Sequence, residues 1–232
     1  MGVDDFLNGQ TLLIDKPLEW SSFQVVNKLR WLIRKQFDIK KIKVGHAGTL
    51  DPLATGLLLI CTGKFTKTIN ELQGQIKEYT GTINLGGTTP SYDLETEVDQ
   101  TYPTDHITKE SIVKATEQFI GEIDQFPPVF SALKKDGKRL YEYARKGEEV
   151  EVASRKIEIK EFEITSIDLE NYKVEFRVVC SKGTYIRSLA HDFGKALNSG
   201  GHLVVLRRTK IGDYNVDNAI TPEAFEKMIT NL

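Results

Sequence analysis

The chain has 232 residues, 40% of them hydrophobic, which is enough to build a sizeable core in one large domain or two small ones. It has no apolar run near the roughly 18 residues that cross a bilayer, and its first residues do not resemble a secretory signal. Its two cysteines, Cys61 and Cys180, lie in apolar contexts typical of buried thiols, so we expect a reducing, cytoplasmic location and no disulfide framework.

Charge is unevenly distributed along the chain, although the formal net charge is only -2. Residues 28–43 hold seven lysines and arginines against one acid, and residues 134–146 hold six against two. Acidic residues gather instead at 93–99 and 148–151. A basic run is usually a solvated face, so either run alone is weak evidence of nucleic-acid binding.

Short strands and helices alternate through the first half of the chain. The helix at 22–37 has the strongest signal, because Ser21 can cap it and apolar residues recur along one side. The hydrophobic pattern predicts strands at 12–17, 57–61 and 79–85, helices at 22–37 and 65–72, and a polar loop at 88–99.

The second half continues in the same mixed order. The pattern predicts a helix at 108–120, a break at 126–128, paired strands at 157–169 and 172–180, a helix at 184–197, a strand at 203–211 and a closing helix at 222–229. Strands and helices interleave without a strict βαβ repeat, so the predicted fold class is mixed α/β (α+β).

The most informative stretch is residues 45–58, which read GHAGTLDPLATGLL. Its glycines let the backbone bend or approach a ligand closely. Pro52 fixes its own φ and biases Asp51 away from the α region, so Asp51 is presented on a rigid bend before an apolar strand. A plain surface turn, in which Asp-Pro is common, is an equally good interpretation from local chemistry alone.

GHAGTLDPLATGLL resembles the catalytic motif of the bacterial tRNA pseudouridine synthase B family, in which the aspartate attacks the target nucleotide. Further segments resemble this family in the same order along the chain: 77–79, 131–134, 137–147, 180–187 and 201–208. The similarity extends from about Leu12 to Tyr214. It implies the pseudouridine synthase fold, with a mixed, largely antiparallel central sheet, flanking helices and an RNA-gripping insertion.

The resemblance implies three catalytic residues. Asp51 matches the nucleophile, and Arg187 matches the arginine that pairs with it in a two-point grip. Tyr79 matches the tyrosine that stacks on the target base. Asp93 aligns loosely with a family aspartate near the arginine, and its role stays open. Without the motifs, Tyr79 would be read as a packing residue and Arg187 as a surface residue.

The resemblance also implies residues that bind the substrate. His46, Tyr185 and Leu206 match positions around the target uridine. The insertion, at about 127–155, would grip RNA phosphates through three basic residues: Lys134, Lys138 and Arg145. Since a stacked uridine cannot reach a recessed carboxylate, the base would have to be flipped out of the RNA.

The implied activity is isomerisation of uridine 55 in the tRNA T-loop to pseudouridine. This reaction needs no cofactor and no metal, because nothing is oxidised and no water enters the product, and the sequence has no P-loop or dinucleotide-binding motif. We expect one catalytic domain over residues 1–232, lacking the C-terminal RNA-binding domain of longer family members. We also expect a monomer that binds the tRNA T-arm stem-loop and no membrane.

Two other functions stay open on the residues alone. A non-catalytic tRNA chaperone would need the basic insertion but not Asp51. A carboxylate-based nucleoside hydrolase would need Asp51 but leaves the insertion unexplained. The joint presence of Asp51, Tyr79 and Arg187 favours the isomerase.

Overall fold

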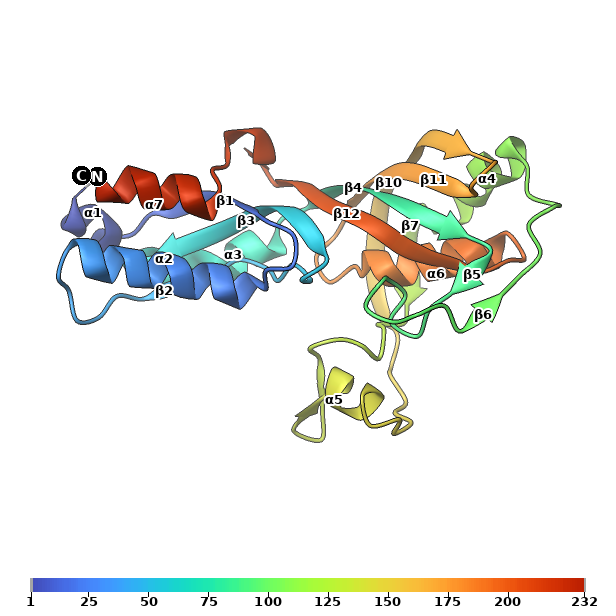
Figure 1. The fold of residues 1–232 in the computed structure, drawn as a ribbon, viewed down its shortest axis with the longest axis horizontal. Coiled ribbons are helices and arrows are strands. Elements are labelled where there is room, and N and C mark those ends of the chain that lie inside the picture. The colour runs from blue at the N-terminus through green and yellow to red at the C-terminus, as the bar shows by residue number, and fades with distance from the viewer. Residues whose placement is uncertain (1, 232) are drawn as a thin grey trace. The chain divides into compact units, whose positions relative to one another are not determined.

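The computed structural model describes residues 2–231, which fall into two units, and Figure 1 labels most of their helices and strands. The first unit contains the chain up to Tyr79 and again from Leu206 onward, and the second contains Thr80–Val205. Strands β4 (Lys77–Leu85) and β12 (Gly201–Ile211) each begin in one unit and end in the other.

The sheet of the first unit is centred on β3 (Ala54–Thr62). β1 (Thr11–Lys16) and β2 (Val44–His46) run antiparallel to β3, whereas β12 runs parallel to the start of β3. β13 (Tyr214–Asn215) pairs antiparallel with the end of β12. The sheet is therefore mixed, as the resemblance implied.

Gly56 in β3 permits the close approach of β12. Its φ is +105°, a conformation that side chains of L-residues rarely adopt, and a Cβ at this position would clash with the main chain of Arg208. The parallel pairing that sets Arg208 beside β3 thus depends on a glycine at this position of the motif.

Helices cover the sheet of the first unit. They are α1 (Val3–Asn8), α2 (Ser22–Gln36), the 3₁₀ turn η1 (Gly63–Thr68), α3 (Ile69–Gly74), the 3₁₀ turn η3 (Val216–Asn218) and α7 (Pro222–Thr230). Ser21 caps α2 as predicted: its hydroxyl accepts from the N–H of Gln24 at 3.2 Å, and its own N–H donates to the Gln24 side chain at 2.7 Å. The apolar side of α2 packs in one cluster with Phe6 and with Phe225 of α7.

The sheet of the second unit has the order β4, β11 (Lys173–Cys180), β10 (Arg155–Asp168) and β7 (Gly121–Gln125). β10 is antiparallel to both of its neighbours. Four aromatic rings pack at centroid distances of 5.4–6.2 Å in the core of this unit: Phe119, Phe162, Phe176 and Phe193.

The remaining elements of the second unit are short, apart from α6 (Ile186–Ala196), which contributes Phe193 to the core. They are β5 (Gly87–Thr88) with β6 (Gln100–Thr101), α4 (Lys109–Ala115), the 3₁₀ turn η2 (Glu117–Phe119), the hairpin of β8 (Lys134–Lys135) and β9 (Lys138–Arg139), and α5 (Leu140–Ala144).

Most predicted elements are confirmed within a few residues, and so is the mixed α/β class. The helix predicted at 108–120 is wrong in length. Thr108 caps it as expected, but α4 ends at Ala115, because the hydroxyl of Thr116 donates back to the carbonyl of Val113 and a 3₁₀ turn follows. The helix predicted at 65–72 likewise starts as a 3₁₀ turn.

Candidate active site

The loop that carries Asp51 is fixed on both sides of the carboxylate by side chains of the first unit. Ser22 Oγ accepts from the N–H of Leu50 at 2.8 Å and donates to the carbonyl of Leu50 at 3.1 Å. Lys16 Nζ donates to the carbonyl of Pro52 at 3.3 Å. Since both neighbours of Asp51 are held, the rigid bend predicted from the sequence is present.

Lys16 is a fully buried cation next to this loop. Its Nζ also donates to the carbonyls of Pro17 at 2.9 Å and Trp20 at 2.6 Å. Burial lowers the pKa of Lys16 to about 8, although the neighbouring charge of Asp51 acts in the opposite direction. A buried amine with three main-chain acceptors anchors the start of α2 to the Asp51 loop.

Arg208 on β12 is a second buried cation that binds this loop. Its Nε donates to the carbonyl of Leu57 at 2.7 Å, and its Nη2 donates to the carbonyl of Gly48 at 3.2 Å. The guanidinium therefore ties the segment before Asp51 to the strand after it.

His46 ends β2 five residues before Asp51. Burial lowers the pKa of His46, and the charge of Arg208 lowers it further, while a hydrogen bond to the backbone of Gly48 partly offsets both. A neutral imidazole near pH 7 follows.

Tyr79 and Leu206 also belong to the first unit. Tyr79 lies on β4 and Leu206 on β12, opposite Ala54 at the start of β3, and both side chains are largely buried. Leu206 therefore lies beside the first residue of β3, directly after the Asp51 loop. The N–H of that residue, Ala54, donates to the carbonyl of Asp51 at 3.1 Å.

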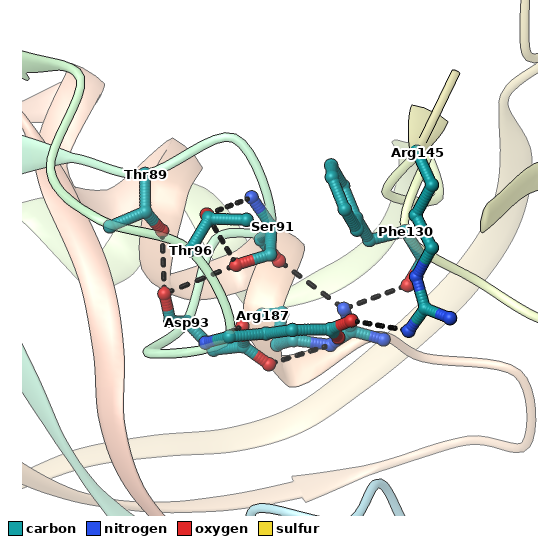
Figure 2. A network of polar contacts seen from close by, with 8 residues as sticks. Thr89, Ser91, Asp93, Thr96, Phe130, Arg145 and Arg187 are labelled. Atoms are coloured by element: carbon teal, nitrogen blue, oxygen red, sulfur yellow. Dashed lines mark hydrogen bonds and ion pairs between the residues drawn. The ribbon is translucent and has the colours of Figure 1, made fainter. Parts of the chain in front are cut away.

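Arg187 is the second residue of α6 in the second unit and is 4% exposed. Figure 2 shows its guanidinium at the centre of a polar network. Its Nη1 donates to the carbonyls of Ser91 at 3.2 Å and Phe130 at 2.9 Å, and its Nε lies 3.6 Å from Asp93 Oδ2. The role left open for Asp93 is thus an ion pair with Arg187.

The segment around Asp93 is itself held by hydrogen bonds (Figure 2). The hydroxyls of Thr89 and Ser91 donate to the carbonyl of Asp93 at 2.7 and 3.2 Å, and Asp93 Oδ1 accepts from the N–H of Glu95 at 3.0 Å. Arg187 is therefore oriented by a fixed loop.

The predicted RNA-gripping residues lie on the β8–β9 hairpin and just after α5. Lys134 and Lys138 are exposed on the hairpin. Arg145, labelled in Figure 2, is exposed too, but its Nη2 forms an ion pair with Glu95 at 2.9 Å. The side chains of Lys138 and Arg145 also lie over the rings of Tyr143 and Tyr141, at 5.7 and 5.2 Å from their centroids.

Tyr185 immediately precedes α6 and is half-buried. Gln125 holds its main chain through two hydrogen bonds, one accepted from the N–H at 2.8 Å and one donated to the carbonyl at 3.0 Å. The guanidinium of Arg155 lies 4.8 Å from the centroid of the Tyr185 ring. These contacts fix the main chain of Tyr185 and place a cation over its ring, two residues before Arg187.

The predicted site residues thus fall into two sets. Asp51, His46, Tyr79 and Leu206 belong to the first unit, and the residues of the second unit are Arg187, Tyr185, Lys134, Lys138 and Arg145. The pairing of Asp51 with Arg187 stays a prediction.

Comparison with known proteins identifies the family. Residues 34–186 match the N-terminal domain of the TruB family of pseudouridylate synthases. Residues 187–231 match the C-terminal domain of tRNA pseudouridylate synthase B. The chain belongs to the TruB family of pseudouridylate synthases.

Two bacterial relatives match this TruB family chain over nearly their full length. It is 67% identical to tRNA pseudouridine synthase B of Flavobacterium johnsoniae, over 99% of the chain and 100% of the relative. It is 56% identical to the protein of the same name in Phocaeicola vulgatus, over 97% of the chain and 95% of the relative.

Solved structures show the same fold. A Cbf5–Nop10–Gar1 complex contains a chain that is 29% identical with a TM-score of 0.68, and an H/ACA ribonucleoprotein bound to a substrate RNA containing 2′-deoxyuridine contains one that is 27% identical with the same score. The matches cover 95% and 98% of this chain, which spans about half the length of those proteins, 54% and 55%.

Two TruB residues that build the site were missed by sequence reasoning. Lys16 lies at the end of a predicted strand, before a proline, and Arg208 lies within a segment that resembles the family. The sequence assigned a role to neither residue. A charged residue on a strand is usually exposed. Burial of these two depends on main-chain carbonyls of a folded loop, and no sequence pattern reports those.

Other features of the family chain can be checked in the described residues. Between residues 2 and 231, no helix has the length and apolar character needed to span a bilayer. Over the same range, no cluster of three or more His, Cys, Asp or Glu side chains could hold a metal ion. Cys61 and Cys180 are both buried and form no disulfide, in line with the prediction of buried thiols.

Substituting Lys16→Met is expected to destabilise the fold by about 3 kcal/mol, because the carbonyls of Pro17, Trp20 and Pro52 each lose a hydrogen bond from the buried amine. The difference in the free energy of unfolding between wild type and Lys16→Met should depend on pH. The pKa of Lys16 is about 8 in the folded protein and higher in the unfolded chain, so the unfolded chain binds the extra proton between these values and wild-type stability rises with pH there.

The check is urea unfolding of wild type and Lys16→Met at pH 7 and at pH 9.5. The gap between the two proteins should widen at the higher pH, since the variant lacks this titration. An equal gap at both values would show that Lys16 is not the buried titrating amine described above.

Proposed function

We propose that this chain converts uridine 55 in the T-loop of tRNA to pseudouridine, with Asp51 as the nucleophile. The observation that carries the proposal is the Asp51 loop. The family motif lies on a bend whose main chain is held on both sides of the carboxylate, by Ser22 and Lys16. The relatives' shared name, tRNA pseudouridine synthase B, supports tRNA as the substrate.

The reaction is an isomerisation in which the C–N glycosidic bond breaks, the uracil turns, and a C–C bond forms through C5, whose proton is released while N1 gains one. A carboxylate can divide this change into two easier steps by forming and then breaking a covalent bond. Attack on the sugar, attack on the ring and removal of a sugar proton all require the Asp51 carboxylate, so replacing it tests all three routes.

Arg187 and Tyr79 would complete the catalytic set. A guanidinium stays charged and can hold a carboxylate at two points, which suits Arg187 as the ion-pair partner of Asp51. Its bonds to Ser91, Phe130 and Asp93 support this role, because they leave the group oriented before substrate arrives. Stacking of the flipped uracil on Tyr79 would contribute about 1–3 kcal/mol.

The uridine must leave the stacked RNA to meet these residues, at a cost of a few kcal/mol. His46, Tyr185 and Leu206 would border the flipped nucleoside. Phosphate contacts on the insertion would offset the cost of flipping, through the exposed cations of Lys134, Lys138 and Arg145. We further expect a cytoplasmic monomer with a single catalytic domain that recognises the T-arm stem-loop.

The position is tested with a tRNA transcript carrying 5-tritiated uridine, from which pseudouridine formation releases tritium. Wild-type protein should release tritium from the normal transcript, and a transcript with cytidine at position 55 should release none above background. If the transcript with cytidine at position 55 still releases tritium, uridine 55 is not the target nucleotide.

Neutralising the insertion with Lys134→Gln, Lys138→Gln and Arg145→Gln together is expected to weaken tRNA binding by roughly tenfold or more at low salt. The slope of log affinity against log salt should fall by about two to three, since each lost phosphate contact contributes about 0.7–0.9. Filter binding between 50 and 200 mM salt measures both quantities.

Glu95→Gln is the matched control, because it removes the carboxylate that pairs with Arg145 and adds no charge to the hairpin. Its tRNA affinity should not fall. If the triple variant binds tRNA with the wild-type salt slope, the insertion does not grip phosphates.

A further inference from the structure

A groove of about 710 Å³ in the first unit is lined by seven basic side chains and no acidic one. α2 contributes Arg30 and Arg34, and the connection from α2 to β2 contributes Lys40, Lys41 and Lys43. The chain as a whole has a net charge of -2, so this concentration of positive charge does not follow from composition.

The groove has a second wall in η1, which adds Lys64 and Lys67. One main-chain hydrogen bond joins the two walls, and a bond from a side chain braces the first wall. The N–H of Gly63 donates to the carbonyl of Lys43 at 2.9 Å, and Arg30 Nη2 donates to the carbonyl of Val44 at 3.0 Å. The basic residues are therefore set around the groove by the fold.

Across residues 2–231, no carboxylate forms an ion pair with any of these seven side chains. Arg34 and Lys64 contact only neutral oxygens, those of Ile39 and Asn8, at 3.4 and 3.0 Å. Arg207 of the same unit differs, since Asp15 binds its guanidinium at two points, 2.7 and 3.0 Å. Clustered cations that no carboxylate neutralises repel one another, and a polyanion would relieve that repulsion.

We propose that this groove binds the phosphate backbone of tRNA at nucleotides several positions away from the target uridine. The proposal rests on the proposed function in taking tRNA as the ligand. Lysine dominates the groove, and lysine contacts phosphate as a point charge, so the groove would hold the backbone and read no bases.

The distance from the groove to Asp51 follows from β3. At one end of this strand the N–H of Ala54 donates to the carbonyl of Asp51, and at the other end Thr62 is followed by Gly63 at the groove. From the first to the last of its nine residues the strand advances by about 3.3 Å per step, so the two ends lie roughly 26 Å apart. A nucleotide at Asp51 and a phosphate in the groove therefore belong to well-separated parts of one RNA.

The test neutralises three lysines whose side chains make no hydrogen bond in the described structure: Lys40→Gln, Lys41→Gln and Lys67→Gln. We expect affinity for a full tRNA transcript to fall roughly tenfold or more, with the salt slope lower by about two to three. Affinity for, and tritium release from, a minimal T-arm stem-loop should fall much less, because so short an RNA has few phosphates at that distance from its target uridine.

The matched control removes three exposed lysines outside the groove: Lys109→Gln, Lys160→Gln and Lys227→Gln. It should change tRNA affinity much less than the groove variant. If the two triple variants bind tRNA equally well, the groove does not bind RNA and its charge serves another polyanion, such as an acidic protein. Wild-type protein that binds tRNA through the groove yet forms no pseudouridine would refute the proposed activity alone.

Discussion

Replacing Asp51 by asparagine is expected to lower the rate of pseudouridine formation in a tRNA transcript by at least about 10³-fold, the scale seen when a covalent catalyst loses its nucleophile. Asparagine has nearly the same shape but no negative charge, so it can neither attack carbon nor remove a proton as a carboxylate does. Affinity for tRNA should change little, because the main-chain bonds of Leu50 and Pro52 do not involve the Asp51 side chain.

Tritium release under single-turnover conditions measures the rate, and filter binding measures the affinity. Asp51→Glu is a useful comparison, since it keeps the charge and moves it by one methylene, and it should fall between wild type and Asp51→Asn. If wild type and Asp51→Asn bind tRNA equally and neither releases tritium, the chain is a tRNA chaperone. Wild-type turnover by Asp51→Asn would remove Asp51 from the mechanism.

Replacing Arg187 by methionine is expected to lower the free energy of unfolding by about 3–5 kcal/mol, the usual result of removing one partner from a buried ion pair. The carbonyls of Ser91 and Phe130 would lose a donor, and the buried carboxylate of Asp93 would lose its cation. Urea unfolding measures this loss, and it should be visible whatever Arg187 contributes to catalysis.

Arg187→Lys separates stability from catalysis. It keeps the positive charge, so the stability loss should be smaller, but an ammonium carries its three donors on one atom and cannot span Ser91, Phe130, Asp93 and a catalytic carboxylate as a planar guanidinium would. We expect a folded protein with near-normal tRNA affinity whose pseudouridine formation falls by at least about 10²-fold. Asp93→Asn, which alters only the orienting carboxylate, should retain more activity. A folded Arg187→Lys with wild-type turnover would show that Arg187 is purely structural.

Much of the fold could be predicted from the sequence, because its strongest signals are local. Ser21 and the apolar stripe after it define α2, and the turn after Asp168 separates two alternating strands. β7 was missed because it is short and lies at an edge, where only its pairing with β10 makes it a strand. β2 was missed for a similar reason, since three residues carry no readable period.

The candidate site likewise has features that the local sequence predicts and others that it does not. The bend at Asp51 could be predicted, because glycine and proline restrict the backbone wherever they occur. Lys16 and Arg208 could not be assigned, because Lys16 meets the carbonyl of Pro52, and Arg208 those of Gly48 and Leu57, only in the folded chain. Asp93 could be aligned only loosely, and its contact with Arg187 became visible once the loop at 89–96 was in place.

In the proposed function, the ion pair between Arg145 and Glu95 would make phosphate binding at the insertion a competition between anions. A phosphate that approaches Arg145 would meet a carboxylate already bound to Nη2, so a single weak anion would gain little, whereas a strand that offers several phosphates at once could succeed. Glu95 lies two residues from Asp93, whose carboxylate accepts from the Glu95 N–H. A phosphate bound at Arg145 would therefore lie one short loop away from the carboxylate that pairs with Arg187.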